Sequence, residues 1–213
     1  MQERARRTRQ AVVRAAAAAF EVNGYGATTL QDIVAREDVS RGALYFHFPT
    51  KEALAVAIVR EYGAMWDELV ATLRPGQPRA VRLLIEFSFA VGRAFGGNVI
   101  ARAGTRLLLE TRLYESELPP PYAGWIGTVE EVLADARRQG DLASGADTAE
   151  LAKFLVAAFT GLQQIVMTGG GPEDTDSCIA TMWRCVLPGL VAPERLPDFT
   201  DLVGLPEPGA RGR

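Results

Sequence analysis

The 213-residue sequence is poor in the side chains that serve as metal ligands and catalytic bases. Its single histidine is His47, so any scheme that pairs a nucleophile with a histidine base must be built on that residue. Cys178 and Cys185 are seven residues apart on one predicted helix, about 10 Å along its axis, which is too far for a disulfide. No Cys-x-x-Cys pair or Cys/His cluster suggests a metal. We therefore expect no cofactor, no metal and no enzymatic activity, with both cysteines buried as small apolar side chains.

The sequence also lacks a long apolar run. The longest stretch, from Phe154 to Met167, is interrupted by Gln163 and Gln164 and is shorter than the roughly 20 residues that span a bilayer. The N-terminal segment MQERARRTRQ has no apolar core of the length that a signal peptide needs. We therefore expect a cytoplasmic protein with no membrane association.

Composition and charge indicate a folded protein whose N-terminal part is net positive and whose remaining part is net negative. Hydrophobic residues make up 48% of the chain and charged residues 23%, which excludes a disordered tail, a collagen-like repeat and a coiled-coil rod. Residues 1–60 contain nine Lys and Arg against six Asp and Glu, whereas residues 61–213 contain 14 against 20. A basic end on an acidic body suits a protein that approaches phosphate with one end only.

Apolar residues recur at helical spacing along the whole chain and no segment alternates as a strand does, so we expect an all-α fold. Gly24 should stop the first helix. Glycine and proline punctuation predicts helices at residues 4–23, 29–37, 40–48, 50–69, 78–95, 98–113, 122–139, 147–168 and 174–190. The Pro/Gly-rich tail from about residue 193 is expected to be partly mobile.

The segment from Thr28 to Lys51 carries the clearest motif. Thr29 followed by Asp32 predicts a capping box that opens one short helix, and Ser40 is positioned to cap a second. Two short helices across a tight turn form a helix-turn-helix, whose second helix lies in the major groove of DNA. We expect DNA contacts from the small-faced start of that helix, from an arginine suited to guanine or phosphate, and from polar side chains on the flanks: Thr29, Ser40, Arg41, Gly42, Ala43, Tyr45, His47 and Lys51.

Some of these assignments have alternatives that the sequence leaves open. His47 either contacts phosphate or packs against its neighbours. Lys51 is either a phosphate contact, which the adjacent helix N-terminus favours, or a solvated lysine. The arginines of the N-terminal segment form either an arm on the DNA backbone or a merely soluble terminus: Arg4, Arg6, Arg7 and Arg9.

The run VSRGALYFHFPTKEAL at residues 39–54, preceded by GYGATTLQDIVA, closely resembles the DNA-binding domain of TetR-family transcriptional repressors. The resemblance is strong over residues 1–60. It implies a dimeric all-α protein with three N-terminal helices on DNA, and later helices that form a ligand pocket and a four-helix dimer interface. We therefore expect a DNA-binding domain at residues 1–50 and a ligand-binding and dimerisation domain at residues 51–213, connected by the fourth helix.

Four segments are similar to the γ-butyrolactone-type autoregulator receptors, the TetR-family branch that controls antibiotic production: residues 42–58, 101–111, 117–133 and 182–191. In that branch a tryptophan after a proline-rich turn lies against the bound signal, and Trp125 matches it. The expected ligand-binding residues are this tryptophan, two polar residues and three apolar ones: Trp125, Thr160, Gln163, Phe87, Leu107 and Phe159. The three apolar residues are equally candidates for plain core, and the polar pair for contacts to backbone or across a dimer. Helices at residues 154–168 and 177–190 would supply the dimer interface.

The patterns and resemblances together predict a homodimeric repressor of antibiotic or secondary-metabolite genes, associated with the nucleoid. It would bind a pseudo-palindromic operator of double-stranded DNA and be released by a small hydrophobic signalling molecule, a γ-butyrolactone, a butenolide or a furan carboxylate. A pseudo-receptor of the same fold would respond instead to antibiotics or their intermediates. Two other classes stay open: a lactone or ester hydrolase, disfavoured because no histidine follows residue 47, and a DNA-binding protein without a ligand.

Overall fold

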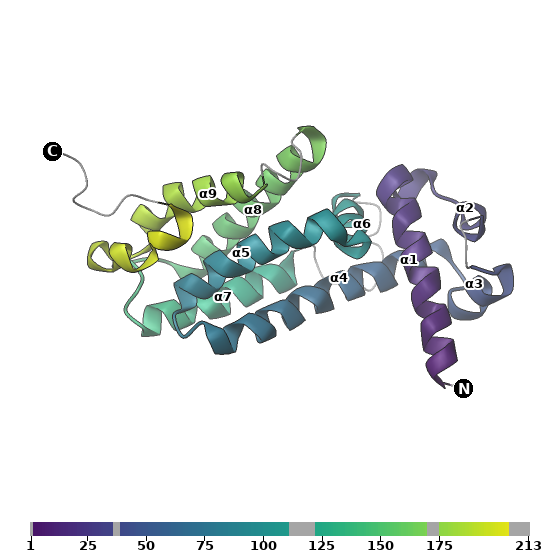
Figure 1. Ribbon diagram of the computed structural model, residues 1–213, viewed down its shortest axis with the longest axis horizontal. Coiled ribbons are helices and arrows are strands. Elements are labelled where there is room, and N and C mark those ends of the chain that lie inside the picture. The colour runs from purple at the N-terminus through teal and green to yellow at the C-terminus, as the bar shows by residue number, and fades with distance from the viewer. Residues whose placement is uncertain (1, 36–38, 111–121, 170–174, 205–213) are drawn as a thin grey trace. The chain divides into compact units, whose positions relative to one another are not determined.

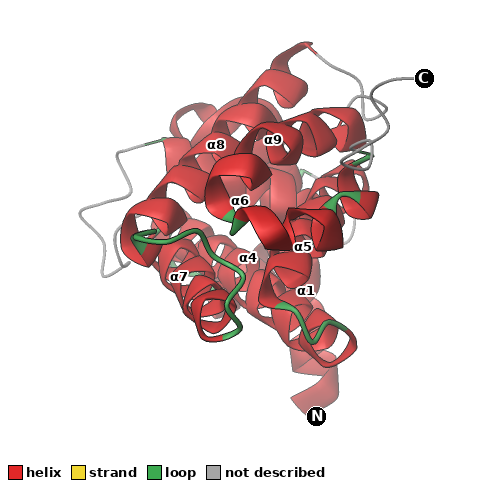
Figure 2. Ribbon diagram, turned by 90° about the vertical axis from the view of Figure 1, so that its left-hand side faces the viewer, coloured by secondary structure: helices red, strands yellow, loops and turns green. Residues whose placement is uncertain are grey.

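The computed structural model describes residues 2–35, 39–110, 122–169 and 175–204. Within these ranges the chain is helical with short loops and has no β-strand, which confirms the predicted all-α fold (Figure 2). The α-helices of the described chain follow one another in the predicted order (Figure 1): α1 (Gln2–Ala27), α2 (Leu30–Val34), α3 (Arg41–His47), α4 (Lys51–Leu73), α5 (Ala80–Gly97), α6 (Val99–Leu109), α7 (Ala123–Arg138), α8 (Thr148–Gly169) and α9 (Thr175–Leu190). The helix ends predicted at residues 37 and 113 lie outside the described residues.

Local signals set the ends of the N-terminal helices. The Thr29 hydroxyl accepts a hydrogen bond from the Asp32 N–H, and the Asp32 carboxylate accepts one from the Thr29 N–H, so the predicted capping box opens α2. The Ser40 hydroxyl accepts from the Ala43 N–H at 3.1 Å and caps α3, as predicted. Gly24 has a left-handed φ of 77°, which breaks the regular geometry of α1 at the predicted stop, although helical turns continue past it.

The described chain forms two compact units, and the division falls inside α4 between Met65 and Trp66. The first unit contains residues 2–65 and 97–110, and the second contains residues 66–96 and 122–204. The first unit extends beyond the predicted boundary at residue 50 because the first half of α4 belongs to it and because α6 packs against α1.

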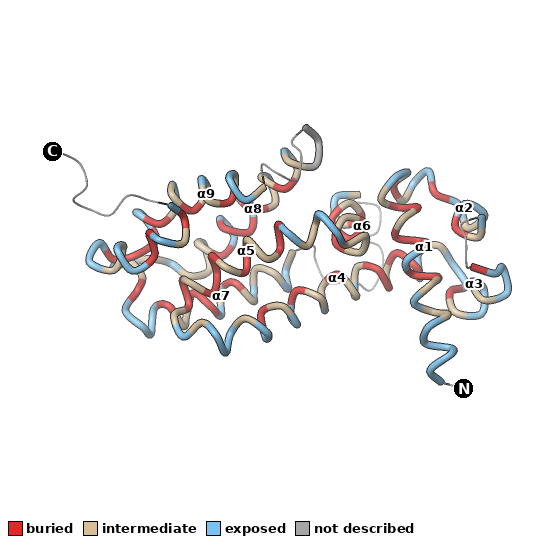
Figure 3. The backbone as a smooth tube through the Cα atoms, in the orientation of Figure 1, coloured by how far each residue is buried: buried red, intermediate tan, exposed pale blue. Residues whose placement is uncertain are grey.

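One apolar core holds the first unit together. The helices of the unit turn buried side chains inward, and α1, α2, α3 and the first half of α4 also carry exposed positions on their outer faces (Figure 3). The largest fully buried side chains come from α1, α2, α3, α4 and α6: Phe20, Ile33, Leu44, Leu54, Ile58 and Leu107. The helix-turn-helix is therefore anchored through the inner faces of α2 and α3, and their outer faces stay free for a partner.

The second unit is a helical bundle of α5, α7, α8 and α9 with the last part of α4. α8 packs against both α7 and α9, and fully buried side chains such as Ile85, Leu133 and Leu187 fill the interior. α8 is the one described helix with the length and apolar composition of a membrane span, over Thr148–Val166. Only 28% of that window is buried in the described structure, so α8 also exposes apolar surface, including Phe154 and Ile165.

One expectation about the C-terminal part needs correction. Cys185 is exposed and Cys178 is half-buried, so the thiols are not the buried apolar groups that we expected, and both are free. The tail from about residue 193 begins with 3-10 helices at Pro193–Phe199 and Asp201–Val203, and its last stretch, residues 205–213, lies outside the described residues. Phe199 and Val203 are buried, which holds this part of the tail on the second unit.

Candidate DNA-binding surface and ligand pocket

The first turn of α3 is exposed and, apart from Arg41, carries small side chains. Arg41 and Gly42 are exposed, and no described atom lies within 4 Å of the position that a Cβ on Gly42 would take. Leu44 points into the core of the first unit and so fixes which face of α3 stays outside. A first turn that combines one long donor with open backbone can approach the base edges of a DNA groove.

The second turn of α3 carries an aromatic side chain that the predicted DNA contacts do not include. Phe46 is 80% exposed and Tyr45 beside it is 46% exposed. The Phe46 ring meets the His47 ring edge-on, with 5.0 Å between centroids, so His47 packs on one side against its neighbour. Leu44 and Phe48 are both buried and lie four positions apart, and this spacing was the signal that residues 45 and 46 face outward.

Two other predicted DNA contacts already serve as helix caps. The Thr29 hydroxyl lies 2.7 Å from Oδ2 of Asp32, and the Ser40 hydroxyl is engaged by the backbone of α3. Both residues are exposed. A contact from either hydroxyl to DNA would therefore be made in addition to its capping role.

The ammonium group of Lys51 is directed at the C-terminal end of α1. Its Nζ donates to the carbonyl oxygens of Tyr25 at 2.7 Å and of Thr28 at 2.9 Å, and it lies 4.4 Å from the centroid of the Tyr25 ring. Burial, and then the nearby Glu52 carboxylate, raise the pKa of the Tyr25 hydroxyl. Lys51 thus ties the start of α4 to the end of α1, a role that neither alternative for this residue included.

The N-terminal arginines lie on the first turns of α1 and not on an extended arm. Arg7 pairs with Glu3 on the exposed surface, where an ion pair contributes little to stability. Arg9 pairs with Glu61 of α4 at 3.2 Å, and its guanidinium lies 5.1 Å from the centroid of the Phe48 ring. Arg9 is therefore part of the packing of the first unit.

Charged side chains of α6 hold the C-terminal end of α1. Arg102 pairs with Glu21 at 2.6 Å, and Arg106 donates to the backbone carbonyl of Glu21 at 2.6 Å. The Glu110 carboxylate accepts a hydrogen bond from the Tyr25 N–H at 2.6 Å. α6 therefore fixes the segment of α1 that leads into the helix-turn-helix, through partners 81 to 85 positions apart in the chain.

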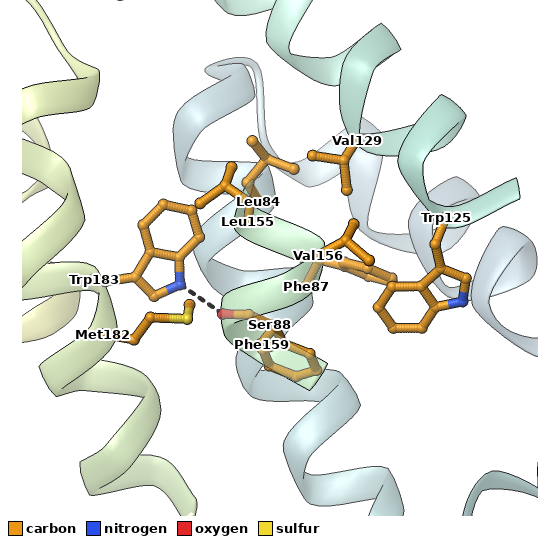
Figure 4. Close-up of a pocket in the computed structure, with 10 residues that line it drawn as sticks. All are labelled: Leu84, Phe87, Ser88, Trp125, Val129, Leu155, Val156, Phe159, Met182 and Trp183. Atoms are coloured by element: carbon orange, nitrogen blue, oxygen red, sulfur yellow. Dashed lines mark hydrogen bonds between the residues drawn. The ribbon is translucent and has the colours of Figure 1, made fainter. Parts of the chain in front are cut away.

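The second unit encloses an apolar cavity between α5, α7, α8 and α9 (Figure 4). The lining side chains are aromatic or aliphatic apart from one hydroxyl: Leu84, Phe87, Ser88, Trp125, Val129, Leu155, Val156, Phe159, Met182 and Trp183. The cavity has a volume of about 30 Å³, which is room for about two water molecules. A larger ligand must therefore displace some of these side chains.

Trp125, in the first turn of α7, is the centre of the aromatic wall of this cavity. The rings of Trp66 and Phe87 each lie 5.7 Å from it between centroids, and the ring of Phe159 lies 6.2 Å away. Three predicted ligand residues, Phe87, Trp125 and Phe159, therefore meet at one wall. Leu107 does not line this cavity, because α6 packs against α1 and buries Leu107 in the core of the first unit.

The polar groups at the cavity are few and uncharged. Ser88 donates to the Ile85 carbonyl at 2.7 Å and accepts from the Trp183 indole N–H at 2.8 Å, so its hydroxyl is engaged in both senses (Figure 4). Among the described residues that line the cavity, none is ionisable. A charged ligand would find no counter-charge on these walls.

Gln163 and Thr160 lie on α8 beyond the lining residues. Gln163 follows Phe159 by four positions, so the two side chains lie on the same face of α8. Its side chain is buried, at 6% exposure, and its amide nitrogen finds no hydrogen-bond partner within the described chain. A buried amide without a hydrogen-bond partner lowers the stability of the fold by about 1–3 kcal/mol. The Gln163 amide could therefore donate a hydrogen bond to a ligand that offers an acceptor. Thr160 is half-buried.

Both parts of the chain match known protein families. Residues 12–58 match the family of bacterial regulatory proteins called the tetR family, and residues 79–192 match the tetracyclin repressor-like C-terminal domain. The first match includes α2 and α3, and the second includes the cavity residues Phe87, Trp125 and Phe159.

Individual relatives agree with these matches. The A-factor receptor protein of Streptomyces griseus is 34% identical over 195 residues, which cover 90% of this chain and 67% of the relative. A crystal structure of a γ-butyrolactone receptor, an ArpA-like protein, is similar with a TM-score of 0.82 at 31% identity, over 94% of this chain and 96% of that one. The protein CprB of Streptomyces coelicolor, solved in complex with its biological operator sequence, is similar with a TM-score of 0.78 at 31% identity and the same coverage, 94% and 96%.

Proposed function

Because this chain belongs to the TetR family of bacterial regulatory proteins, we propose that it is a homodimeric repressor that a small neutral signal of the γ-butyrolactone type releases from its operator. The observation that carries this proposal is an apolar cavity around Trp125 in a chain that also presents an exposed helix-turn-helix. We propose further that the protein acts in the cytoplasm, at the nucleoid, on antibiotic or secondary-metabolite genes.

The proposed DNA contacts centre on α3. Arg41 donates to a guanine edge in the major groove, and the small first turn lets the backbone approach. Ser40, Gly42 and Ala43 make up the small start of α3 that approaches the base edges, and other residues contact sugar and phosphate: Thr29, Tyr45, His47 and Lys51. A dimer presents two copies of α3 to a pseudo-palindromic operator, with half-sites about 34–36 Å apart.

The proposed dimer interface lies on α8 and α9. Phe154 and Ile165 are large apolar side chains on one helix, α8, and are 55% and 72% exposed in the single protomer. Pairing of α8 and α9 with the same helices of a second protomer would remove such side chains from water in a four-helix interface.

The chemistry of the cavity favours a neutral signal. Burial of a carboxylate without a counter-charge is far more costly than burial of a lactone carbonyl, which needs only a donor. The walls offer aromatic and aliphatic contact, with Trp125 as a stacking surface, and the Gln163 amide offers a donor nearby. A γ-butyrolactone or a butenolide therefore fits this site better than a furan carboxylate.

The size of the cavity suggests how binding is linked to release from DNA. Because the cavity volume is about 30 Å³, binding of the signal requires a state in which side chains of the surrounding helices have moved. A ligand shifts an equilibrium by its differential affinity for the two states. We propose that the expanded state places the two recognition helices at a separation that no longer matches one turn of DNA.

Selection from a random duplex pool followed by release tests would examine this function. The purified dimer should select a pseudo-palindrome, and alkyl γ-butyrolactones should release it in a fluorescence anisotropy assay. Release by antibiotics but by none of the lactones would identify a pseudo-receptor. Consumption of the lactone during the assay would identify a hydrolase and contradict the proposal.

A further inference from the structure

Two further spaces lie between the ligand cavity of the proposed function and the surface of the second unit. The first has a volume of about 10 Å³ and shares three wall residues with the ligand cavity: Phe87, Trp125 and Val129. The second is an open groove of about 450 Å³ along α4 and α7, and it shares Asp67 and Thr128 with the first. The three spaces are therefore neighbours, separated by shared side chains, in a series that leads from the apolar interior to the open groove.

Trp125 stands at the narrow point of this series. It lines both the ligand cavity and the 10 Å³ space, and it is only half-buried. Its ring packs edge-on against Trp66 at 5.7 Å, and Trp66 lines the same narrow space from α4. Movement of Trp125 away from Trp66 would join the groove to the ligand cavity.

The first turn of α7, which carries Trp125, has features that lower its helical stability. Tyr122, which precedes α7, has a left-handed φ of 64°, unfavourable for a non-glycine residue, and no described side chain caps the helix there. Gly124 and Gly127 flank the tryptophan, and no described atom lies within 4 Å of the Cβ that either glycine lacks. Packing therefore does not require glycine at either position, and each glycine lowers the helical stability of this turn.

We propose that the groove between α4 and α7 is the mouth of the ligand site, and that the glycine-flanked first turn of α7 is a gate that swings Trp125 aside to admit the signal. This inference rests on the ligand pocket of the proposed function. The groove carries the carboxylates of Asp67 and Glu131, whereas its Arg74 is paired with Asp135 at 2.8 Å. The mouth is therefore net negative and disfavours anions, as do the uncharged walls of the ligand cavity.

Alanine substitution of the two glycines tests the gate without steric conflict. We expect Gly124→Ala with Gly127→Ala to stabilise the closed turn and to slow both entry and exit, by about fivefold for each glycine. The equilibrium dissociation constant should stay within about twofold, because a gate changes both rates alike. Gly96→Ala in α5, also a helical glycine with open space at its Cβ, is the matched control.

Stopped-flow binding of N-phenyl-1-naphthylamine, a neutral fluorophore that brightens in apolar surroundings, provides the rates. Amide hydrogen exchange over residues 123–128 shows independently that the turn has been stabilised. Slower association and dissociation in the double variant, with native rates in Gly96→Ala, would support the gate. Native rates in a double variant whose amides exchange more slowly would overturn the gate alone. Failure of the wild-type protein to bind the fluorophore would contradict the pocket, and thus the proposed function itself.

Discussion

Substitution of Trp125 by alanine should separate sensing from DNA binding. The residue makes three aromatic contacts within the second unit and belongs to neither α2 nor α3. Each aromatic pair contributes about 0.5–1.5 kcal/mol, and the half-buried position of Trp125 places the total loss of stability at roughly 2–3 kcal/mol. Such a loss lowers the melting temperature of a chain of this size by about 5–10 °C and leaves it folded.

The expected phenotype of Trp125→Ala is a super-repressor. Operator affinity should stay within about twofold of wild type, because the helix-turn-helix is unchanged, whereas half-release should need at least about tenfold more γ-butyrolactone. Fluorescence anisotropy with labelled operator measures both quantities in one titration. Trp125→Phe, which keeps an aromatic face, should lie between the two proteins. Native release of Trp125→Ala by the lactone would refute the assignment of this residue to the ligand site.

Three further substitutions test the DNA contacts and the donor in the pocket. Lys51→Ala should lower the free energy of unfolding by about 1.5–3 kcal/mol, because charged hydrogen bonds are lost. It should also reduce the magnitude of the slope of log K for DNA binding against log salt concentration by about 0.9 per subunit. An unchanged slope would leave Lys51 a purely structural residue. Arg41→Ala should relax preference at one base pair per half-site by about 1–3 kcal/mol, and uniform weakening across operator variants would reassign it to the backbone. Gln163→Leu should stabilise the free protein by about 1 kcal/mol in denaturant unfolding and raise the lactone needed for half-release about tenfold; native release would exclude Gln163 as the donor.

Local chemistry made the start of the fold predictable. The hydroxyls of Thr29 and Ser40 cap helices because each lies three residues before a backbone N–H that it can reach. Such signals depend only on residues that are close together in the sequence, so the sequence alone predicts them. The inward faces of the helices follow from the spacing of apolar residues in the same way. Phe87, Trp125 and Phe159 could be grouped through the family resemblance together with this spacing.

Contacts between distant segments account for what the sequence did not reveal. Leu107 has the spacing of a pocket residue, but α6 packs on α1 and uses it as core. Lys51 has the position of a phosphate contact, and its neighbours in the sequence did not reveal that carbonyl oxygens 23 and 26 positions earlier accept hydrogen bonds from its ammonium. Cys185 has the hydrophobicity of a core residue, but its side of α9 is exposed in the single protomer. In each case the tertiary arrangement of the helices, which neighbouring residues do not encode, decides the environment of the side chain.

Release by a matched pair of ligands tests the central claim most directly. An alkyl γ-butyrolactone and its ring-opened γ-hydroxy carboxylate share one carbon skeleton and differ mainly in charge. Titrated against the dimer on labelled operator at neutral pH, the lactone should release the DNA, and the carboxylate should need at least about 100-fold higher concentration because the cavity offers no counter-charge. Equal release by both compounds, or release by neither, would contradict a repressor governed by a neutral signal in the Trp125 cavity.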